Sequence, residues 1–250
     1  MAEKVLMKGN EALAEAAIMA GCKYYFGYPI TPQTEVAAYM SKRMPKIGGT
    51  FLQAESEIAA INMVIGVSAC GKRVMTSSSS PGISLKSEGI SYLAGCDLPA
   101  LIVNVQRGGP GLGGIQPSQS DYFQALKGGG HGDYKLIVLA PASVQEMVDL
   151  TFKGFDLADK YRMQAMILAD GTMGQMMEPV SLELGEVKQY DKPWATTGTG
   201  THDGRNVVNS LSLNAQQLEE WNISRYDRYK IVERDEVLYE EFMMEDAEIC

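Results

Sequence analysis

The chain has 250 residues, of which 45% are hydrophobic, as expected for one large α/β domain with or without an extension. Its net charge of −9 is concentrated near the end, because residues 218–250 contain eleven acidic and four basic residues. The nearly neutral remainder lacks the basic surface that nucleic-acid binding requires, so we expect no nucleic-acid partner.

Two further features of the sequence indicate where the protein is located in the cell and whether this chain binds a metal. No apolar segment approaches the roughly 18 residues of a membrane span, and residues 1–5 do not resemble a secretion signal, so we expect a cytoplasmic protein without membrane contact. The cysteines are widely spaced and form no C-x-x-C pair, so we expect buried free thiols and no metal site in this chain. They are Cys22, Cys70, Cys96 and Cys250.

Short apolar segments alternate with helical segments over roughly the first 180 residues. The expected strands cover residues 23–26, 50–54, 73–77, 100–106, 136–139 and 164–169. The expected helices cover residues 10–20, 32–43, 57–69, 83–94 and 143–160. Asn10, Ser56 and Ser143 are expected to cap the first, third and fifth of them. Continuous apolar strands separated by helices indicate a three-layer αβα fold with a mostly parallel six-stranded sheet.

The character of the sequence changes after this region. Residues 190–206 are rich in threonine and glycine, and residues 214–241 form a polar, acidic helical segment. One stripe of that segment carries Leu218, Trp221, Tyr229 and Val232, interrupted by Arg225. We therefore assign residues 1–185 to the αβα domain, and residues 186–250 to a linker and an extended C-terminal arm.

Two strand-to-helix turns, at residues 28–32 and 53–57, provide candidate site residues. Open parallel sheets bind ligands at the carboxyl ends of their strands, where these turns lie. Thr31 is either a ligand-binding hydroxyl or the N-cap of a helix with proline in its first position. Glu55 and Glu57 either stabilise a helix start through its dipole or present a carboxyl group to a ligand's ring nitrogen.

The longest loop, residues 107–133, adds two more candidates. Arg107 follows an apolar strand and could grip a carboxylate, although a surface arginine is the simpler interpretation. Residues 109–114 formally match G-x-G-x-x-G, but the residues after them do not resemble the helix that a dinucleotide fingerprint should open. Neither a G-x-x-x-x-G-K-[ST] loop nor a G-x-S-x-G elbow is present, which argues against P-loop and serine-hydrolase chemistry.

Four segments together resemble a known family. They are Tyr-Pro-Ile-Thr-Pro at 28–32, Gln-Ala-Glu-Ser-Glu-Ile-Ala-Ala at 53–60, Thr-Ser-Ser-Ser-Ser-Pro-Gly at 76–82 and Asn-Val-Gln-Arg-Gly-Gly at 104–109. In this order and spacing, they resemble the subunit of 2-oxoacid:ferredoxin oxidoreductases that carries the pyrimidine-side domain of the thiamine diphosphate site. The resemblance continues through residues 128–134 into the tail, and it is nearest to the branched-chain (2-oxoisovalerate) or 2-oxoglutarate type.

This resemblance implies a reaction and a role for particular residues. Family members convert a 2-oxoacid, coenzyme A and oxidised ferredoxin to an acyl-CoA, carbon dioxide and reduced ferredoxin. Glu57 matches the glutamate that hydrogen-bonds the cofactor's aminopyrimidine ring and promotes deprotonation of the thiazolium carbon. Thr31 and Arg107 match residues that contact the 2-oxoacid, and Pro29 and Ile30, with Thr31, would line the cofactor cleft.

The resemblance also implies what this chain lacks. The Gly-Asp-Gly motif for diphosphate and Mg²⁺ is absent, as are iron–sulfur cysteines, so both would belong to partner subunits. Family members begin another α/β domain near residue 250, so we expect a C-terminally truncated member that is inactive alone and could form a homodimer. The alternatives are a pyruvate- or 2-oxoglutarate-type member, a non-catalytic assembly subunit, or a dinucleotide-binding oxidoreductase that uses residues 109–114. The roles of residues 108–132 and of His131 are left open.

Overall fold

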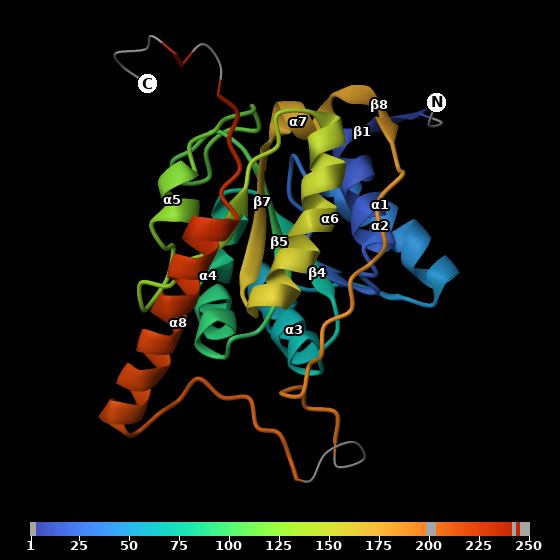
Figure 1. Ribbon diagram of the computed structural model, residues 1–250. Coiled ribbons are helices and arrows are strands. Elements are labelled where there is room, and N and C mark those ends of the chain that lie inside the picture. The colour runs from blue at the N-terminus through green and yellow to red at the C-terminus, as the bar shows by residue number, and fades with distance from the viewer. Residues whose placement is uncertain (1–3, 199–203, 242–243, 246–250) are drawn as a thin grey trace. The chain divides into compact units, whose positions relative to one another are not determined.

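Six parallel strands form the central sheet of the computed structural model, which describes residues 4–198, 204–241 and 244–245 (Figure 1). Its strand order is β3-β2-β4-β5-β7-β6. The strands are β2 (Tyr24–Gly27), β3 (Thr50–Gln53), β4 (Val74–Ser78), β5 (Ala100–Gln106), β6 (Ile137–Leu139) and β7 (Gln164–Asp170). All six were predicted. Strands β4 and β5 are buried along their whole length, which explains why their sequences do not alternate.

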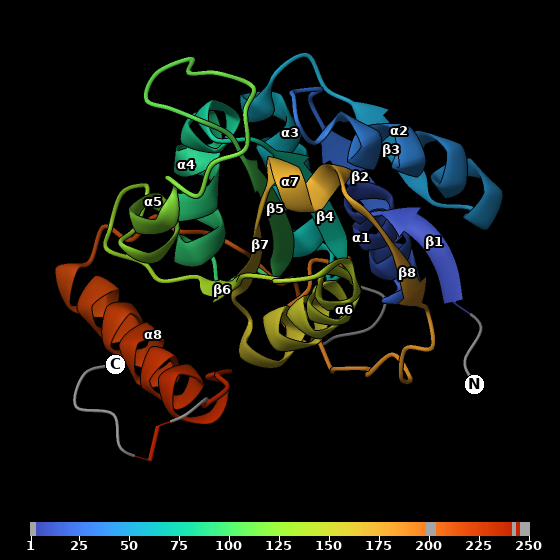
Figure 2. The ribbon, with the colours of Figure 1, turned by 90° about the horizontal axis from the view of Figure 1, so that it is seen from above.

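Helices cover both faces of this sheet (Figure 2). On one face, α1 (Gly9–Met19) packs beside α2 (Thr34–Arg43) and α6 (Val144–Tyr161). On the other face, α3 (Glu57–Ala69) packs against α4 (Pro81–Gly95). The predicted three-layer αβα fold is therefore confirmed. Three short helices lie in the connections, and they are η1 (Met44–Ile47), α5 (Tyr122–Leu126) and α7 (Gly171–Gln175).

A second, two-stranded sheet was not predicted. Strand β1 (Lys4–Lys8) pairs antiparallel with β8 (Met177–Ser181), and Met7 and Val180 are buried in a cluster with residues of α1 and α6. Each strand is short and partly exposed, and β8 contains a proline, so neither shows a strand pattern of its own. The pairing joins residues more than 160 positions apart, which local sequence signals do not reveal.

The chain divides into two units, Met1–Ser210 and Leu211–Cys250, while the predicted boundary after residue 185 stays a prediction. Within the first unit, the extended segment that follows β8 packs on the domain. Ala195 is buried, both the N–H and the hydroxyl of Thr196 donate to the carbonyl of Ala69, and the Arg162 guanidinium lies 4.6 Å from the ring centroid of Trp194.

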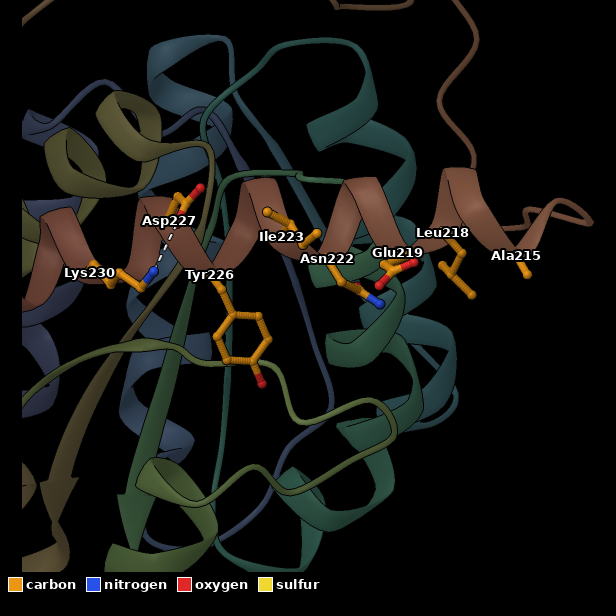
Figure 3. Close-up of a pocket in the computed structure, with 8 residues that line it drawn as sticks. All are labelled: Ala215, Leu218, Glu219, Asn222, Ile223, Tyr226, Asp227 and Lys230. Carbon is orange, nitrogen blue, oxygen red and sulfur yellow. Dashed lines mark hydrogen bonds and ion pairs between the residues drawn. The ribbon is translucent and has the colours of Figure 1, made fainter.

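The second unit contains the predicted helix, which ends earlier than expected. Helix α8 runs from Ala215 to Asp235, and the Asn214 side chain caps it by accepting from the Gln217 N–H at 3.2 Å. Figure 3 shows eight α8 residues that line an open hollow of about 480 Å³, with Leu218 and Tyr226 on one side of the helix. Leu218 was predicted on a stripe with Trp221, but it is 39% exposed, and it lies two four-residue steps before Tyr226 on the same side of the helix.

The remaining global predictions concern cysteines and membrane spans. Cys22 is buried, and this burial raises the pKa of its thiol to about 12, whereas Cys70 is exposed and Cys96 half-buried, so the prediction of uniformly buried thiols is wrong. Predicted features at 199–203, 242–243 and 246–250, including Thr201 and Cys250, lie outside the described residues. None of the helices in the described ranges is long and apolar enough to cross a membrane.

The order of the strands determines where a ligand site can form. After β2 the chain adds β3 on one side, and then crosses to β4 on the other side of β2. Such a reversal leaves a crevice at the carboxyl ends of the two strands. The turn at residues 28–32 follows β2, and the serine run at 77–80 ends β4, so both border this crevice.

Candidate functional site

Glu55 and Glu57, which the sequence could not separate, have different environments. Helix α3 begins at Glu57, and the predicted cap is confirmed because the Ser56 hydroxyl accepts from the Ala59 N–H at 3.1 Å. Glu57 is 5% exposed, whereas Glu55 is exposed. No described residue hydrogen-bonds the Glu57 carboxylate. Glu57 is therefore a buried acceptor at the crevice without a protein partner.

Gly82 in the first turn of α4 forms a close wall for this carboxylate. A Cβ atom built on Gly82 would lie 2.8 Å from Glu57 Oε1 and would also collide with Ser78 Oγ. The hydroxyl oxygens of Ser78 and Ser79 are buried without hydrogen-bond partners. Glycine is therefore required by the close approach of α4 to α3, and the unpaired Ser78 hydroxyl lies against the same glycine as Glu57.

A buried chain of hydrogen bonds fastens the turn after β2 to strand β4. Tyr25 Oη and Ser77 Oγ are 2.7 Å apart, Ser77 Oγ donates to Gln33 Oε1 at 2.5 Å, and Gln33 Nε2 donates to the Tyr28 carbonyl at 3.1 Å. Burial raises the pKa of the Tyr25 phenol above its usual range, so this group stays neutral. The chain of bonds fixes the turn relative to the serine run.

The two caps predicted for α1 and α2 are wrong. Helix α2 begins at Thr34, three residues after Thr31, and α1 begins at Gly9 rather than after Asn10. Tertiary hydrogen bonds hold both segments instead. Arg107 donates to the Thr31 carbonyl at 3.1 Å, and Asn10 Nδ2 donates to the carbonyl of the next residue, a proline, at 2.8 Å.

The turn therefore leaves part of its surface to solvent. Pro29 and Thr31 are exposed and Ile30 is half-buried, so these three residues border the crevice. Thr31 also borders a pocket of about 610 Å³, whose wall combines apolar residues with Glu35 and Gln175. The pocket is lined by Thr31, Pro32, Glu35, Ile115, Pro117, Gly171, Thr172, Gln175 and Met176.

Arg107 lies beside Thr31 and is not a surface residue. It is 6% exposed, its two terminal nitrogens donate to the carbonyls of Thr31 at 3.1 Å and Leu112 at 2.8 Å, and its buried Nε has no partner. The structure thus brings together two of the predicted substrate residues from the ends of β2 and β5. An unpaired guanidinium N–H remains there as a donor.

A cluster of polar side chains holds the backbone of Arg107, and the sequence analysis did not predict it. Ser80 has an unusual φ of 24°, its hydroxyl donates to Asp121 Oδ2 at 2.6 Å, and the Arg107 N–H donates to Ser80 Oγ at 3.0 Å. Asn104 Nδ2 also donates to Asp121 Oδ2, at 2.9 Å. Asn104 interrupts an apolar strand and Asp121 lies within the long loop, so only the serine run could have signalled this cluster.

The glycine-rich loop lacks the geometry of a dinucleotide fingerprint. The Gly114 N–H donates to the Gly108 carbonyl at 2.8 Å, the Gly108 N–H donates to the Gln116 carbonyl at 2.9 Å, and Arg107 forms an antiparallel bridge with Pro117. The loop folds back on itself and opens no helix at this point. His131 is exposed, and its carbonyl accepts from the Ser91 hydroxyl at 2.6 Å.

Lys86 is a further residue that sequence reasoning missed. It is fully buried, and its Nζ donates to Thr76 Oγ1 at 2.6 Å and to the Ser77 carbonyl at 3.3 Å. Burial lowers the pKa of Lys86 to about 7, while the Glu57 carboxylate acts in the opposite direction. A lysine within an otherwise ordinary helical segment gives no sequence signal of such burial.

Comparisons with known proteins agree with this geometry. The chain matches the family described as pyruvate flavodoxin/ferredoxin oxidoreductase, thiamine diphosphate-binding, over residues 15–235. It is 55% identical to ketoisovalerate oxidoreductase subunit VorB of Methanothermobacter marburgensis over 245 residues, which cover 98% of this chain and 69% of that protein. It is 47% identical to 2-oxoglutarate synthase subunit KorA of Archaeoglobus fulgidus, covering 76% of this chain and 55% of the relative.

A solved structure shows the same arrangement of elements. The chain is similar to 2-oxoglutarate:ferredoxin oxidoreductase from Magnetococcus marinus with a TM-score of 0.84 and 31% identity. The match covers 96% of this chain and 46% of the solved chain. The similarity therefore extends over nearly all of this sequence but over less than half of that protein.

Proposed function

The chain belongs to the thiamine diphosphate-binding pyruvate flavodoxin/ferredoxin oxidoreductase family, and from this premise we propose that it is a subunit of a 2-oxoacid:ferredoxin oxidoreductase. The complex would convert a 2-oxoacid and coenzyme A to acyl-CoA and carbon dioxide and pass two electrons to ferredoxin. A branched-chain substrate is favoured because the ketoisovalerate relatives are 55% and 53% identical, against 47% for the KorA subunit of Archaeoglobus fulgidus.

The observation that carries this proposal is the environment of Glu57. A carboxylate with 5% exposure and no partner among the described residues faces a glycine wall at the carboxyl edge of a parallel sheet. Buried polar atoms are nearly always hydrogen-bonded in native proteins, so these unpaired atoms fit a bound polar ring. The aminopyrimidine of thiamine diphosphate has ring nitrogens that such an acceptor can engage, and the family match supports this cofactor.

Each of the candidate site residues would then have a distinct role. Bound thiamine diphosphate supplies the electron sink for decarboxylation. Glu57 holds a proton at the pyrimidine side of the site, Pro29 and Ile30 shield the cleft from water, and the Thr31 hydroxyl and Arg107 Nε bind and orient the 2-oxoacid. A positioned carboxyl group of this kind typically contributes about 10²–10⁴-fold in rate.

The rest of the catalytic apparatus would come from partner subunits. This sequence has neither the Gly-Asp-Gly motif for diphosphate and Mg²⁺ nor a cysteine pattern for an iron–sulfur cluster. We therefore assign the diphosphate–Mg²⁺ site, the clusters and the ferredoxin contact to partners. Coenzyme A enters as the acyl acceptor of the complex.

The test is 2-oxoacid-dependent viologen reduction by this chain co-expressed with its partner subunits. Pyruvate, 2-oxoisovalerate and 2-oxoglutarate are supplied separately to wild type, Glu57→Gln and the matched control Glu55→Gln. We expect the highest activity with 2-oxoisovalerate, a loss of about 100-fold or more in Glu57→Gln, and little change in the exposed control. Full activity of Glu57→Gln would instead indicate a non-catalytic assembly subunit, and a preference for 2-oxoglutarate would reassign the substrate.

A further inference from the structure

Lys86 is a buried charged group for which the proposed reaction has no use. Its side chain has 0% exposure, and its Nζ donates to Thr76 Oγ1 and the Ser77 carbonyl, both on β4. An ammonium group has three N–H donors, so one donor has no partner within the described residues. A lysine that only satisfied two β4 oxygens would leave its charge uncompensated, which is costly in a protein interior.

The packing of α4 on α3 places Lys86 in the layer that also holds Glu57. Gly82 lies against the Glu57 carboxylate, and a Cβ atom on Gly89 would lie 2.7 Å from Ile61 Cγ1. Residues 82, 86 and 89 share one face of α4 because helical residues three and four apart are neighbours. Lys86 therefore lies between two places where α4 approaches α3 closely.

Glu57 is the carboxylate that acts on Lys86 from this layer. Its charge raises the pKa of Lys86, whereas burial lowers it. No direct ion pair joins the two groups among the described residues. From β2, the Tyr25 phenol bonds Ser77 and stays neutral; from β4, only hydroxyl and carbonyl groups bond Lys86. Glu88 on α4 itself is exposed and accepts from the Tyr92 hydroxyl.

We propose that Lys86 is a positioning residue for Glu57, and that its ammonium group, held on β4, is the buried countercharge that holds the Glu57 carboxylate in place against Gly82. Opposite charges in a poorly solvated layer favour each other's charged forms. The inference rests on the proposed function only for the role of Glu57 in catalysis. The electrostatic coupling itself is a property of this chain and can be measured without turnover.

The first test is an NMR titration of the chain labelled with ¹³Cε-lysine, with the Lys86 resonance assigned by its loss in Lys86→Arg. We expect Lys86 to titrate at lower pH in Glu57→Gln than in wild type, by roughly one pH unit, because the countercharge is lost. Glu55→Gln removes an exposed carboxylate from the same helix start and should leave the resonance unmoved. An unchanged Lys86 titration in Glu57→Gln would overturn the proposal.

The second test is the pH dependence of kcat in the co-expressed complex. Lys86→Met keeps the volume of the side chain but removes its charge. The acid limb of the kcat profile should therefore move to higher pH by roughly one pH unit. Lys86→Arg keeps the charge and should restore the acid limb. A profile unchanged in Lys86→Met would contradict the positioning role, and if that variant does not fold, the Glu57→Gln titration still decides. Absence of activity with every 2-oxoacid would overturn the proposed function while leaving the measured coupling intact.

Discussion

Two buried arginines at opposite ends of the sheet have very different surroundings. Arg73, just before β4, is bonded on every side: its Nε donates to Asp159 at 2.8 Å, one terminal nitrogen to Asp156 at 2.6 Å and the other to the Ala20 carbonyl at 2.6 Å. Arg107, just after β5, bonds two backbone carbonyls, and its Nε is buried without a partner. At Arg107 no carboxylate among the described residues neutralises the charge.

The difference separates a charge that holds the fold from one that is available for binding. At the amino end, Lys192 of the segment after β8 also bonds Asp159, at 2.5 Å, so the cluster ties that segment to the sheet. At the carboxyl end, Ser78, Ser79 and Arg107 each have a buried atom without a partner, and the Glu57 carboxylate, which lies with Ser78 against Gly82, has none among the described residues. Buried polar groups without partners are rare in native proteins and often mark functional sites.

Arg73→Met should cause the largest change and should act on stability. Removing Arg73 leaves Asp156 without its countercharge and Asp159 with Lys192 alone, which costs about 3–5 kcal/mol of unfolding free energy. Arg43→Met is the matched control, because Arg43 makes a bidentate pair with Glu15 nearer the surface. We expect a loss of about 1 kcal/mol or less there. Urea unfolding measures both, and equal losses would remove the distinction between the two pairs.

Lys86→Met should change the pH dependence of stability. Burial lowers the pKa of Lys86 to about 7 from its usual 10.5, so the charged form is disfavoured in the folded chain. The unfolded chain then binds more protons between these two values, and stability should rise with pH across that range. Lys86→Met removes the penalty, so it should be more stable than wild type by a few kcal/mol at pH 6 and lose this advantage near pH 10.

The measurement is urea unfolding at pH 6, 8 and 10, with Lys72→Met as the exposed control. The stability difference between Lys72→Met and wild type should not vary with pH. If the unfolding free energies of wild type and Lys86→Met differ by the same amount at all three pH values, the pKa of Lys86 does not change on unfolding in this range.

Gly82→Ala should damage the carboxyl edge directly. The added Cβ would lie 2.8 Å from Glu57 Oε1 and would collide with Ser78 Oγ, so the carboxylate or the helix must move. We expect about 1–3 kcal/mol of lost stability and at least about a 10-fold loss of viologen reduction in the complex. Gly66→Ala lies in α3 with no atom within 4 Å of the new Cβ, and should gain about 0.5–1 kcal/mol with full activity.

The two serine caps give the smallest and most closely matched comparison. Ser56 caps α3 beside Glu57, and Ser143 caps α6 away from the crevice, each accepting a backbone N–H at 3.1 Å. Alanine at either position should cost about 1 kcal/mol in urea unfolding. Only Ser56→Ala should also raise the thiamine diphosphate concentration needed for half-maximal activity, because Glu57 is the first residue of α3. Equal effects on activity would show that the cap contributes only stability.

Local sequence patterns were sufficient for most of the fold. All six strands of the parallel sheet were predicted from short apolar runs between helical segments, and the caps Ser56 and Ser143 were identified correctly. The caps assigned to Asn10 and Thr31 were wrong. Tertiary hydrogen bonds, which local sequence patterns do not reveal, bind both residues instead: Asn10 Nδ2 donates to a carbonyl of the turn after β2, and Arg107 donates to the Thr31 carbonyl.

The amino-acid sequence alone predicts the parallel αβα architecture, the strand ends at which the candidate residues lie, and the family that they resemble. Tertiary contacts were needed to show that Glu57 is buried while Glu55 is exposed, that Arg107 reaches Thr31, and that Lys86 lies in the layer with Glu57. The physical reason is the range of the interactions. Periodicity and caps depend on neighbours within a few residues, whereas burial and electrostatics depend on groups that strand order brings together.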